Sequence, residues 1–269
     1  MRPSRIKAKL ARQQPVLVTT VHYSDPSIFE LVSLMGFDGI WLDMEHHARS
    51  LEAANSYIRA ARVGASDVIT RPAKGEFMRM GRMLEAGAKG IMYPRCESAT
   101  EAAEVVRWSK FAPWGERGVD TANPDAPYCS MPLPQYIEEA NRETFIVIQL
   151  EQPSAVAQVE AIAAIRGVDI LMLGPADFSV LGGIPGQFDH PLIRDAKKRI
   201  AAAAQNAGIH WGTTCESMEQ IEDALELGAR FICHGADILA VKRGLELVRE
   251  NCHKLGFTFD DPELNRVTL

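Results

Sequence analysis

The chain has 269 residues and a formal net charge of −6, with 46% hydrophobic and 24% charged residues. This mixture is typical of a globular protein, and it excludes collagen, extended disorder and a mini-protein held together by disulfides. The acidic balance lacks the excess of Lys and Arg that would follow a phosphate backbone, so we predict a small-molecule partner and no nucleic-acid partner.

The sequence shows no signal for membrane insertion, secretion or a cysteine-based centre. No stretch approaches the ~18 uninterrupted apolar residues that cross a bilayer, and the basic residues 1–15 lack the apolar region of a signal peptide. We therefore expect no membrane partner and a cytoplasmic location. The five cysteines are scattered without a C-x-x-C pair, which favours reduced structural thiols; Cys215 falls near the expected active face, but no His/Asn arrangement marks it as a nucleophile.

Eight short apolar runs predict β-strands. The first is 16–21 (VLVTTV), and 145–150 (FIVIQL) is another. Six more follow a glycine that ends a helix-like segment, at 36–43, 64–70, 87–94, 167–174, 208–214 and 228–235. Glycine suits the left-handed residue that commonly follows a helix, and apolar runs of this length suit strands buried on both faces.

Helical apolar spacing alternates with these runs. We expect helices over about 26–35, 51–63, 75–86, 98–110, 153–165, 191–207, 217–227 and 236–250. Ser98 and Glu101 have the spacing of a capping box, which marks the start of one of them. The longest irregular piece is 111–132, long enough to be a functional loop.

Eight strands alternating with eight helices in one chain of this length favour a single-domain (β/α)8 TIM barrel over an open doubly wound sheet. We divide the chain into an N-terminal extension (1–13), the barrel (14–252) and a C-terminal tail (253–269).

Polar residues follow the predicted strands at the end where such barrels carry their chemistry. They are Asp43, Glu45, His46, His47, Arg71, Arg95, Gln149, Glu151, Asp177, Thr213, Thr214, Glu216, His234 and Asp237. Any one of them could be a solvated loop charge or a helix cap, but together they would form a like-charged cluster unless a cation or substrate lies among them. His22, after the first strand, either faces this pocket or caps the next turn, and for His234 we favour a supporting or packing role.

Glu151 and Asp177, on neighbouring strands without cysteine ligands, suggest an oxygen-rich site for Mg²⁺ or Mn²⁺. No lysine projects clearly from a strand as a Schiff base requires; Lys74 is the one lysine near the active face. No phosphate-binding glycine motif is present, which argues against ATP and NAD.

Five motifs together resemble the HpcH/HpaI family of class II, metal-dependent pyruvate aldolases. They are 42–47 (LDMEHH), 70–72 (TRP), 115–118 (GERG), 149–151 (QLE) and 174–179 (GPADFS). The resemblance runs from about 14 to 252 and extends to 4-hydroxy-2-oxoheptane-1,7-dioate aldolase and 2-keto-3-deoxy sugar-acid aldolases. It implies retro-aldol cleavage of a 4-hydroxy-2-oxo acid to pyruvate and an aldehyde, with Mg²⁺, Mn²⁺ or Co²⁺.

The resemblance also implies residue roles. Glu151 and Asp177 would ligate the cation, Arg71 would lie over the keto oxygen, and His46, oriented by Asp43, would be the acid/base at the aldehyde oxygen. The main-chain N–H groups of Ala176 and Asp177 would hold the substrate carboxylate, while Gln149 and Glu45 would orient waters.

The chain departs from this pattern at three positions. Met44 replaces a glycine of several relatives, His47 stands where we expect a small residue, and Glu85 replaces an Asp that relatives contribute across a subunit boundary. The resemblance further implies a homohexamer, a trimer of dimers that exchange the C-terminal helix. We expect the loop 120–131 to bear on the choice of aldehyde.

Two alternatives remain open at this point. One is a related enzyme, either a citrate-lyase-like lyase acting on a CoA thioester or an oxaloacetate decarboxylase. The other is a barrel that binds 2-oxo acids without turning them over. A requirement for CoA would identify the thioester lyase, and exchange of pyruvate methyl protons would exclude the binding protein.

Overall fold

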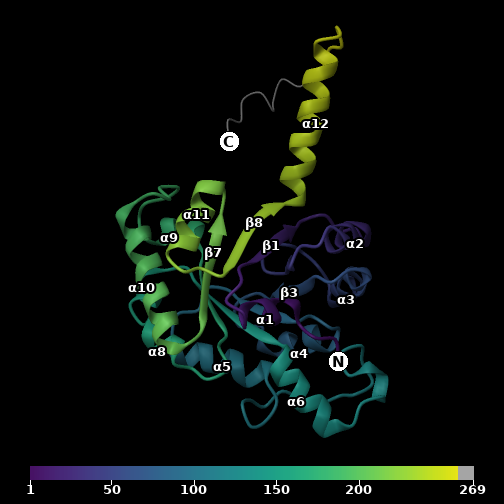
Figure 1. Ribbon diagram of the computed structural model, residues 1–269, viewed down its shortest axis with the longest axis vertical. Coiled ribbons are helices and arrows are strands. Elements are labelled where there is room, and N and C mark those ends of the chain that lie inside the picture. Colours follow the sequence, from purple (N-terminus) through teal and green to yellow (C-terminus); the bar gives the residue numbers. More distant parts are fainter. Residues whose placement is uncertain (260–269) are drawn as a thin grey trace.

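The computed structural model describes residues 1–259 and contains a closed barrel of eight parallel strands in the order β1 to β8 (Figure 1). The strands are β1 Val16–Val21, β2 Gly39–Asp43, β3 Asp67–Arg71, β4 Gly90–Tyr93, β5 Phe145–Leu150, β6 Ile170–Leu173, β7 His210–Cys215 and β8 Phe231–Ala236. Each strand pairs with its sequence neighbour, and β8 pairs with β1. The predicted (β/α)8 barrel is confirmed.

Helices surround the barrel. Their bounds are α1 Arg5–Leu10, α2 Pro26–Leu34, α3 Leu51–Ala60, α4 Phe77–Glu85, α5 Ala99–Ser109, α6 Leu133–Glu143, α7 Pro153–Val156, α8 Val159–Ala163, α9 Pro175–Leu181, α10 Pro191–Ala207, α11 Met218–Glu226 and α12 Asp237–His253. The helix expected over 153–165 is instead two short helices, α7 and α8. Helices α1, α6 and α9 were not predicted, and the capping box at Ser98 is confirmed because its side chain accepts a hydrogen bond from the main-chain N of Glu101.

The N-terminal extension contains α1, which packs at the end of the barrel where the strands begin. Ile6 and Leu10 are buried with apolar side chains from the barrel interior. Asp67, the first residue of β3, accepts hydrogen bonds from the Ser4 hydroxyl (2.6 Å) and the Ile6 main-chain N (2.9 Å). These contacts attach the extension to the barrel, so the open mouth lies at the opposite end.

The loop between α5 and α6 is fixed to the barrel wall by a buried lysine. The ammonium group of Lys110 donates to the main-chain oxygens of Asn141 (3.1 Å) and Thr144 (2.7 Å) and to the Thr144 hydroxyl (3.1 Å). Burial lowers the pKa of Lys110 to about 8. Three oxygen acceptors satisfy the three donors of the ammonium group, which makes this contact a structural anchor.

Helix α12 leaves the barrel instead of packing along it and projects well beyond the other helices (Figure 1). Asp237 is its one buried residue, whereas Leu245, Leu247 and Val248 are exposed by 64%, 58% and 58%. The tail predicted from 253 onward is described only to residue 259.

None of the helices within residues 1–259 combines the length and apolar character that crossing a membrane demands.

Candidate active site

The predicted site residues gather at the mouth of the barrel because parallel strands of a closed sheet all end on one side. Asp43 and Arg71 are the last residues of β2 and β3 and are register partners. Gln149 lies in β5, Glu151 follows that strand directly, and Asp177 lies in the first turn of α9 after β6. The strand order therefore places side chains that are distant in sequence at one rim.

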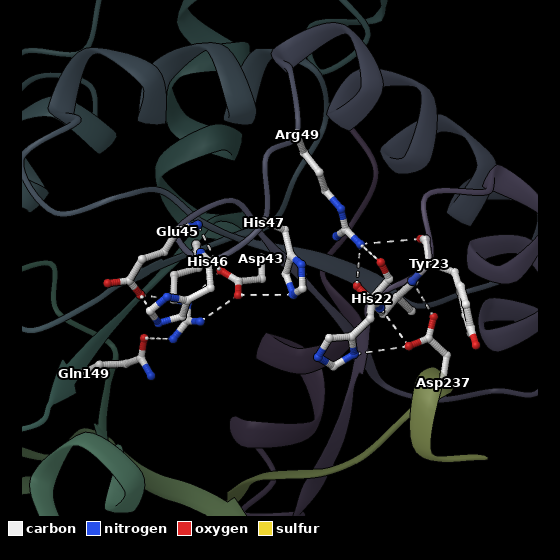
Figure 2. A network of polar contacts seen from close by, with 11 residues as sticks. His22, Tyr23, Asp43, Glu45, His46, His47, Arg49, Gln149 and Asp237 are labelled. Carbon is white, nitrogen blue, oxygen red and sulfur yellow. Dashed lines mark hydrogen bonds and ion pairs between the residues drawn. The ribbon is translucent and has the colours of Figure 1, made fainter. Parts of the chain in front are cut away.

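Arg71 is the most constrained side chain of the mouth, and its partners Asp43, Glu45 and Gln149 are labelled in Figure 2. Its Nε donates to Asp43 Oδ1 at 2.9 Å and its Nη2 to Asp43 Oδ2 at 2.7 Å, which is a bidentate pair. Glu45 Oε2 lies 3.2 Å from Nε, and Nη1 donates to Gln149 Oε1 at 3.4 Å. The guanidinium carbon is 4.5 Å from the centre of the Trp41 ring, so the positive charge is fixed in position and orientation.

The charges of this group depend on one another. Burial alone would raise the pKa of Asp43, but the hydrogen bonds and charge of Arg71 hold that pKa below its ordinary value. Burial would lower the pKa of Arg71, and the contacts with Asp43 raise it instead. The pKa of Glu45 is raised, because burial outweighs the attraction of Arg71. Asp43 and Arg71 therefore form a permanently charged pair beside a carboxyl group that is harder to ionise.

Glu151 is a buried carboxyl group with an unusual setting. It is 2% exposed, and its Oε2 accepts a hydrogen bond from the main-chain N of Arg95 at 2.6 Å. Burial raises its pKa to about 7, with a further contribution from the carboxylates of Asp177 and Glu45. Gly174 leaves the space that Glu151 occupies, since a Cβ on Gly174 would lie 2.5 Å from Glu151 Oε1.

Asp177 completes the acidic side of the mouth. It is partly exposed in the first turn of α9, and its charge acts on the pKa of both Glu151 and Glu45. Ala176 precedes it and is exposed. The first-turn N–H groups of a helix have no partner within that helix, so those of Ala176 and Asp177 are available to an anion at the mouth.

The two adjacent histidines differ from our expectation. We expected Asp43 to orient the imidazole of His46, but Asp43 accepts only a long hydrogen bond from the main-chain N of His46 (3.5 Å). The His46 ring has its Nε2 3.6 Å from Glu45 Oε2 and a side chain that is 59% exposed. Instead, Nε2 of His47 lies 3.8 Å from Asp43 Oδ2. Both carboxylate oxygens of Asp43 bind Arg71, so Asp43 positions the main chain of the turn that carries His46 and does not orient the His46 imidazole.

The structure decides the open question about His22. Its ring Nδ1 lies 3.2 Å from Asp237 Oδ1, and its ring centre is 5.0 Å from that of His47, so it faces the mouth (Figure 2). Arg49, which sequence reasoning missed, donates to the main-chain oxygens of Val21 and His22 at 2.9 and 2.6 Å. Arg49 follows no strand directly, so its position in the sequence gave no signal of this role.

Two further candidates lie apart from the acidic group. His234 has its Nδ1 2.8 Å from the main-chain oxygen of Cys215, which fits the predicted packing role. Glu85 ends α4 and lines a depression with Leu51, Arg82 and Asn123, and none of the mouth residues borders it. Burial raises the pKa of Glu85. Within this single chain Glu85 is not brought to the mouth.

The donor set at the mouth consists of oxygens. Within residues 1–259, no group of three or more His, Cys, Asp or Glu side chains is arranged to hold a metal ion. Glu151 and Asp177 remain as a pair of carboxyl groups, and the pKa of Glu151 is raised by burial first and then by the charge of Asp177. Such a pair suits a hard divalent cation that takes its other ligands from oxygens of substrate and solvent.

Comparisons with known proteins place these features in context. The family model described as HpcH/HpaI aldolase/citrate lyase matches residues 19–243. The chain is 32% identical to a hydroxypyruvate/pyruvate aldolase of Paraburkholderia phytofirmans, over 91% of this chain and 97% of the relative. It is 30% identical to a 5-keto-4-deoxy-D-glucarate aldolase of Klebsiella pneumoniae, over 88% and 91% of the two chains.

A solved structure of an HpcH/HpaI aldolase from Desulfitobacterium hafniense superposes with a TM-score of 0.86 at 28% identity. It covers 95% of this chain and 98% of that one. The similarity to this structure therefore extends over almost the whole chain.

Proposed function

Because the chain belongs to the HpcH/HpaI aldolase/citrate lyase family, we propose that it cleaves a 4-hydroxy-2-oxo acid reversibly to pyruvate and an aldehyde with the help of a divalent cation. The chain is an enzyme of the carbon–carbon lyase class, as predicted. The single observation that carries the proposal is the fixed cation of Arg71 beside the buried carboxyl group of Glu151 at the barrel mouth.

Glu151 and Asp177 would hold the cation, which we take to be Mg²⁺, Mn²⁺ or Co²⁺. Two observations support this assignment: burial, with the nearby charges of Asp177 and Glu45, raises the pKa of Glu151, and Gly174 leaves space beside its carboxyl group. When bound, such an ion would supply Lewis-acid stabilisation for negative charge on the keto oxygen of a 2-oxo acid.

Arg71 would offset the negative charge that develops on the same keto oxygen. Asp43, Glu45 and Trp41 hold its guanidinium group in place, so little reorganisation is needed during the reaction. Gln149 contacts both Arg71 and Glu151, with Nε2 donating to Glu151 Oε1 at 3.4 Å. We assign Gln149 and Glu45 to the orientation of these groups and of nearby water.

His46 would move the proton at the aldehyde oxygen. Its imidazole is exposed at the mouth and lies beside Glu45, so substrate and solvent can both reach it. The main-chain N–H groups of Ala176 and Asp177 would bind the carboxylate of the 2-oxo acid at the start of α9. These assignments leave Asp43 as the residue that positions Arg71 and the turn before His46.

The proposal is tested by proton NMR of pyruvate in D₂O with the purified protein and Mg²⁺ or Mn²⁺. We expect exchange of the pyruvate methyl protons, complete loss of exchange with EDTA, and recovery when the cation is restored. Folded protein that shows no exchange with either cation would overturn the proposal. Activity that requires CoA would then favour the thioester lyase, and binding of pyruvate without exchange would favour the non-catalytic barrel.

We also propose that the enzyme is a homo-oligomer, a hexamer built from dimers that exchange α12. The apolar side chains exposed along the projecting α12 support this arrangement, because an isolated chain would leave them in water. Sedimentation velocity on the full chain tests it, and a monomer at micromolar concentration would refute it. The cytoplasmic location stays a prediction.

A further inference from the structure

Lys74, the one lysine that the sequence places near the active face, has no role in the mechanism above, yet its ammonium group makes specific contacts. It stands in the turn between β3 and α4. Its Nζ donates to the main-chain oxygen of Arg95 at 2.8 Å and to a carboxylate oxygen of Glu97, and Glu101 Oε1 lies 3.5 Å away. Three oxygens therefore surround the ammonium group, and Lys74 connects two neighbouring turns of the rim.

Arg95 has an unusual backbone conformation in the turn between β4 and α5. Its φ is +49°, in the left-handed region that residues with a long side chain rarely adopt. Such a conformation costs free energy and persists only where surrounding contacts hold it. Two contacts grip the peptide unit that follows it: Lys74 binds the Arg95 carbonyl oxygen, and the main-chain N of Cys96 donates to the main-chain oxygen of Gln149 at 3.1 Å.

The peptide unit before the Arg95 Cα points at the acidic side of the mouth. Its N–H, that of Arg95, donates to Glu151 Oε2 at 2.6 Å. This is the shorter of the two hydrogen bonds that Glu151 accepts within residues 1–259, since the other, from Gln149 Nε2, is 3.4 Å long. The φ and ψ of Arg95 set the angle between the two peptide units. A change to negative φ would therefore break the contact with Glu151 or the contact of Cys96 with β5.

The contact of Lys74 with Arg95 is local, and the fold does not depend on it. The side chains of Lys74 and Glu97 are 31% and 53% exposed, so their ion pair contributes little to stability. The turn that carries Lys74 has its own anchor, because the main-chain N of Gly75 donates to the Tyr93 hydroxyl at 3.0 Å. A substitution of Lys74 should therefore release the Arg95 carbonyl group without displacing the strands.

We propose that Lys74 and Arg95 position the carboxyl group of Glu151. Lys74 holds the peptide unit after Arg95, and the left-handed conformation of Arg95 aims its main-chain N–H at Glu151. This inference rests on the proposed function, because it adds two positioning residues to the carboxyl group that would hold the cation there. Arg95 acts through its backbone, since its side chain is exposed and the contact is made by the main chain.

Substitutions of Arg95 separate the backbone from the side chain. Arg95→Asn removes the guanidinium group but keeps a residue that adopts positive φ readily, whereas the β-branched Arg95→Val disfavours it. We expect the affinity of the pyruvate-free enzyme for Mn²⁺, measured by EPR of the free ion, to be about tenfold higher in Arg95→Asn than in Arg95→Val. Pyruvate proton exchange at limiting Mn²⁺ should differ in the same direction.

Substitutions of Lys74 test the contact that holds the turn. Lys74→Met should lower Mn²⁺ affinity about fivefold, because a charged donor to the Arg95 carbonyl group is lost. Added to Arg95→Asn, the same change should lower it by under about twofold, since Asn keeps the left-handed conformation without this contact. Glu97→Gln is the matched control: it removes the charge of the exposed ion pair, leaves the contact of Lys74 with Arg95, and should leave Mn²⁺ affinity unchanged.

Three results would overturn the proposal: equal Mn²⁺ affinities in Arg95→Asn and Arg95→Val, equal losses from Lys74→Met in the two backgrounds, or a loss in Glu97→Gln as large as that in Lys74→Met. Thermal midpoints of the EDTA-treated variants identify any that fail to fold. Absence of pyruvate proton exchange in the unaltered enzyme would instead refute the proposed function. The Mn²⁺ titrations need no turnover, so the two failures are distinguishable.

Discussion

Gly174 offers a direct test of whether the position of Glu151 governs the reaction. Its φ and ψ of −95° and 92° are accessible to any L-residue, so Gly174→Ala introduces no backbone strain. The new Cβ would lie 2.5 Å from Glu151 Oε1 and 2.6 Å from Glu151 Cγ, whereas ordinary contact begins at 3.4 Å. The carboxyl group must therefore move by about 0.9 Å, the difference between these distances.

A displacement of this size should affect catalysis much more than folding. A misplacement of about 1 Å in a reacting constellation can cost about 100-fold in rate, so we expect the rate of pyruvate proton exchange to fall by about that factor. The Glu151 side chain can move within the mouth without breaking the barrel, so the thermal midpoint should shift by only a few degrees. A weaker apparent affinity for Mg²⁺ should accompany the loss of rate.

The matched control is Gly81→Ala in α4, where a Cβ would meet nothing within 4 Å. This change adds helix propensity and should leave proton exchange intact. Both variants are compared by the rate of pyruvate deuteration, by the apparent affinity for Mg²⁺ from titration, and by the thermal midpoint from calorimetry. Full exchange activity in the Gly174→Ala enzyme would refute the reasoning, because Glu151 would then tolerate a shift that the geometry makes unavoidable.

Three further predictions concern charge. Burial raises the pKa of Glu151 from 4.5 to about 7, so ionisation of this carboxyl group opposes folding. In EDTA-treated enzyme, the free energy of unfolding should therefore fall by up to about 3 kcal/mol as the pH rises from 4.5 to 7. Urea titrations of this enzyme and of Glu151→Gln, which lacks the ionisable group, measure the difference. Lys110→Met should lower the free energy of unfolding by about 3 kcal/mol, because three buried oxygens lose their hydrogen-bond donor. The control is Lys242→Met, which removes the exposed ion pair with Glu246 on α12 and should change the free energy of unfolding by under about 0.5 kcal/mol. Asp43→Asn should lower kcat about 100-fold with little change in KM, since Arg71 loses the bidentate partner that fixes its charge; an unchanged kcat would contradict that role.

The barrel could be predicted because the strands are short apolar runs, six of which follow a glycine that ends a helix-like segment. Buried parallel strands tolerate few polar residues, so their ends are marked clearly in the sequence. Helices that depend on tertiary contacts were missed. Helix α1 has only six residues and gains its stability from Ile6 and Leu10 in the barrel interior and from the contact of Ser4 with Asp67.

The positions of Asp43, Arg71 and Glu151 at the mouth could also be predicted, because these residues stand at the ends of strands that the barrel holds in place. The direction of a ring after a strand was not predictable in the same way. Residues 44–50 form an irregular turn, and its backbone decides that the ring of His47, not that of His46, approaches Asp43. The partner of Arg49 is a set of main-chain oxygens, which carry no sequence signal.

This contrast bears on how the enzyme would select a substrate. Arg71 and Glu151, assigned to the 2-oxo acid and its cation, stand at the end of a strand or directly after one, and a buried ion pair fixes Arg71. The imidazole of His47 stands on a turn, is one-third open, and has only a 3.8 Å contact with a carboxylate already bound elsewhere. A change at His47 should therefore cost the barrel little, whereas a change at Arg71 leaves buried acids unpaired. We therefore expect substitutions at the strand ends, at His46 or in the turns that position Glu151 to affect catalysis, and substitutions elsewhere in the turns to affect the choice of aldehyde.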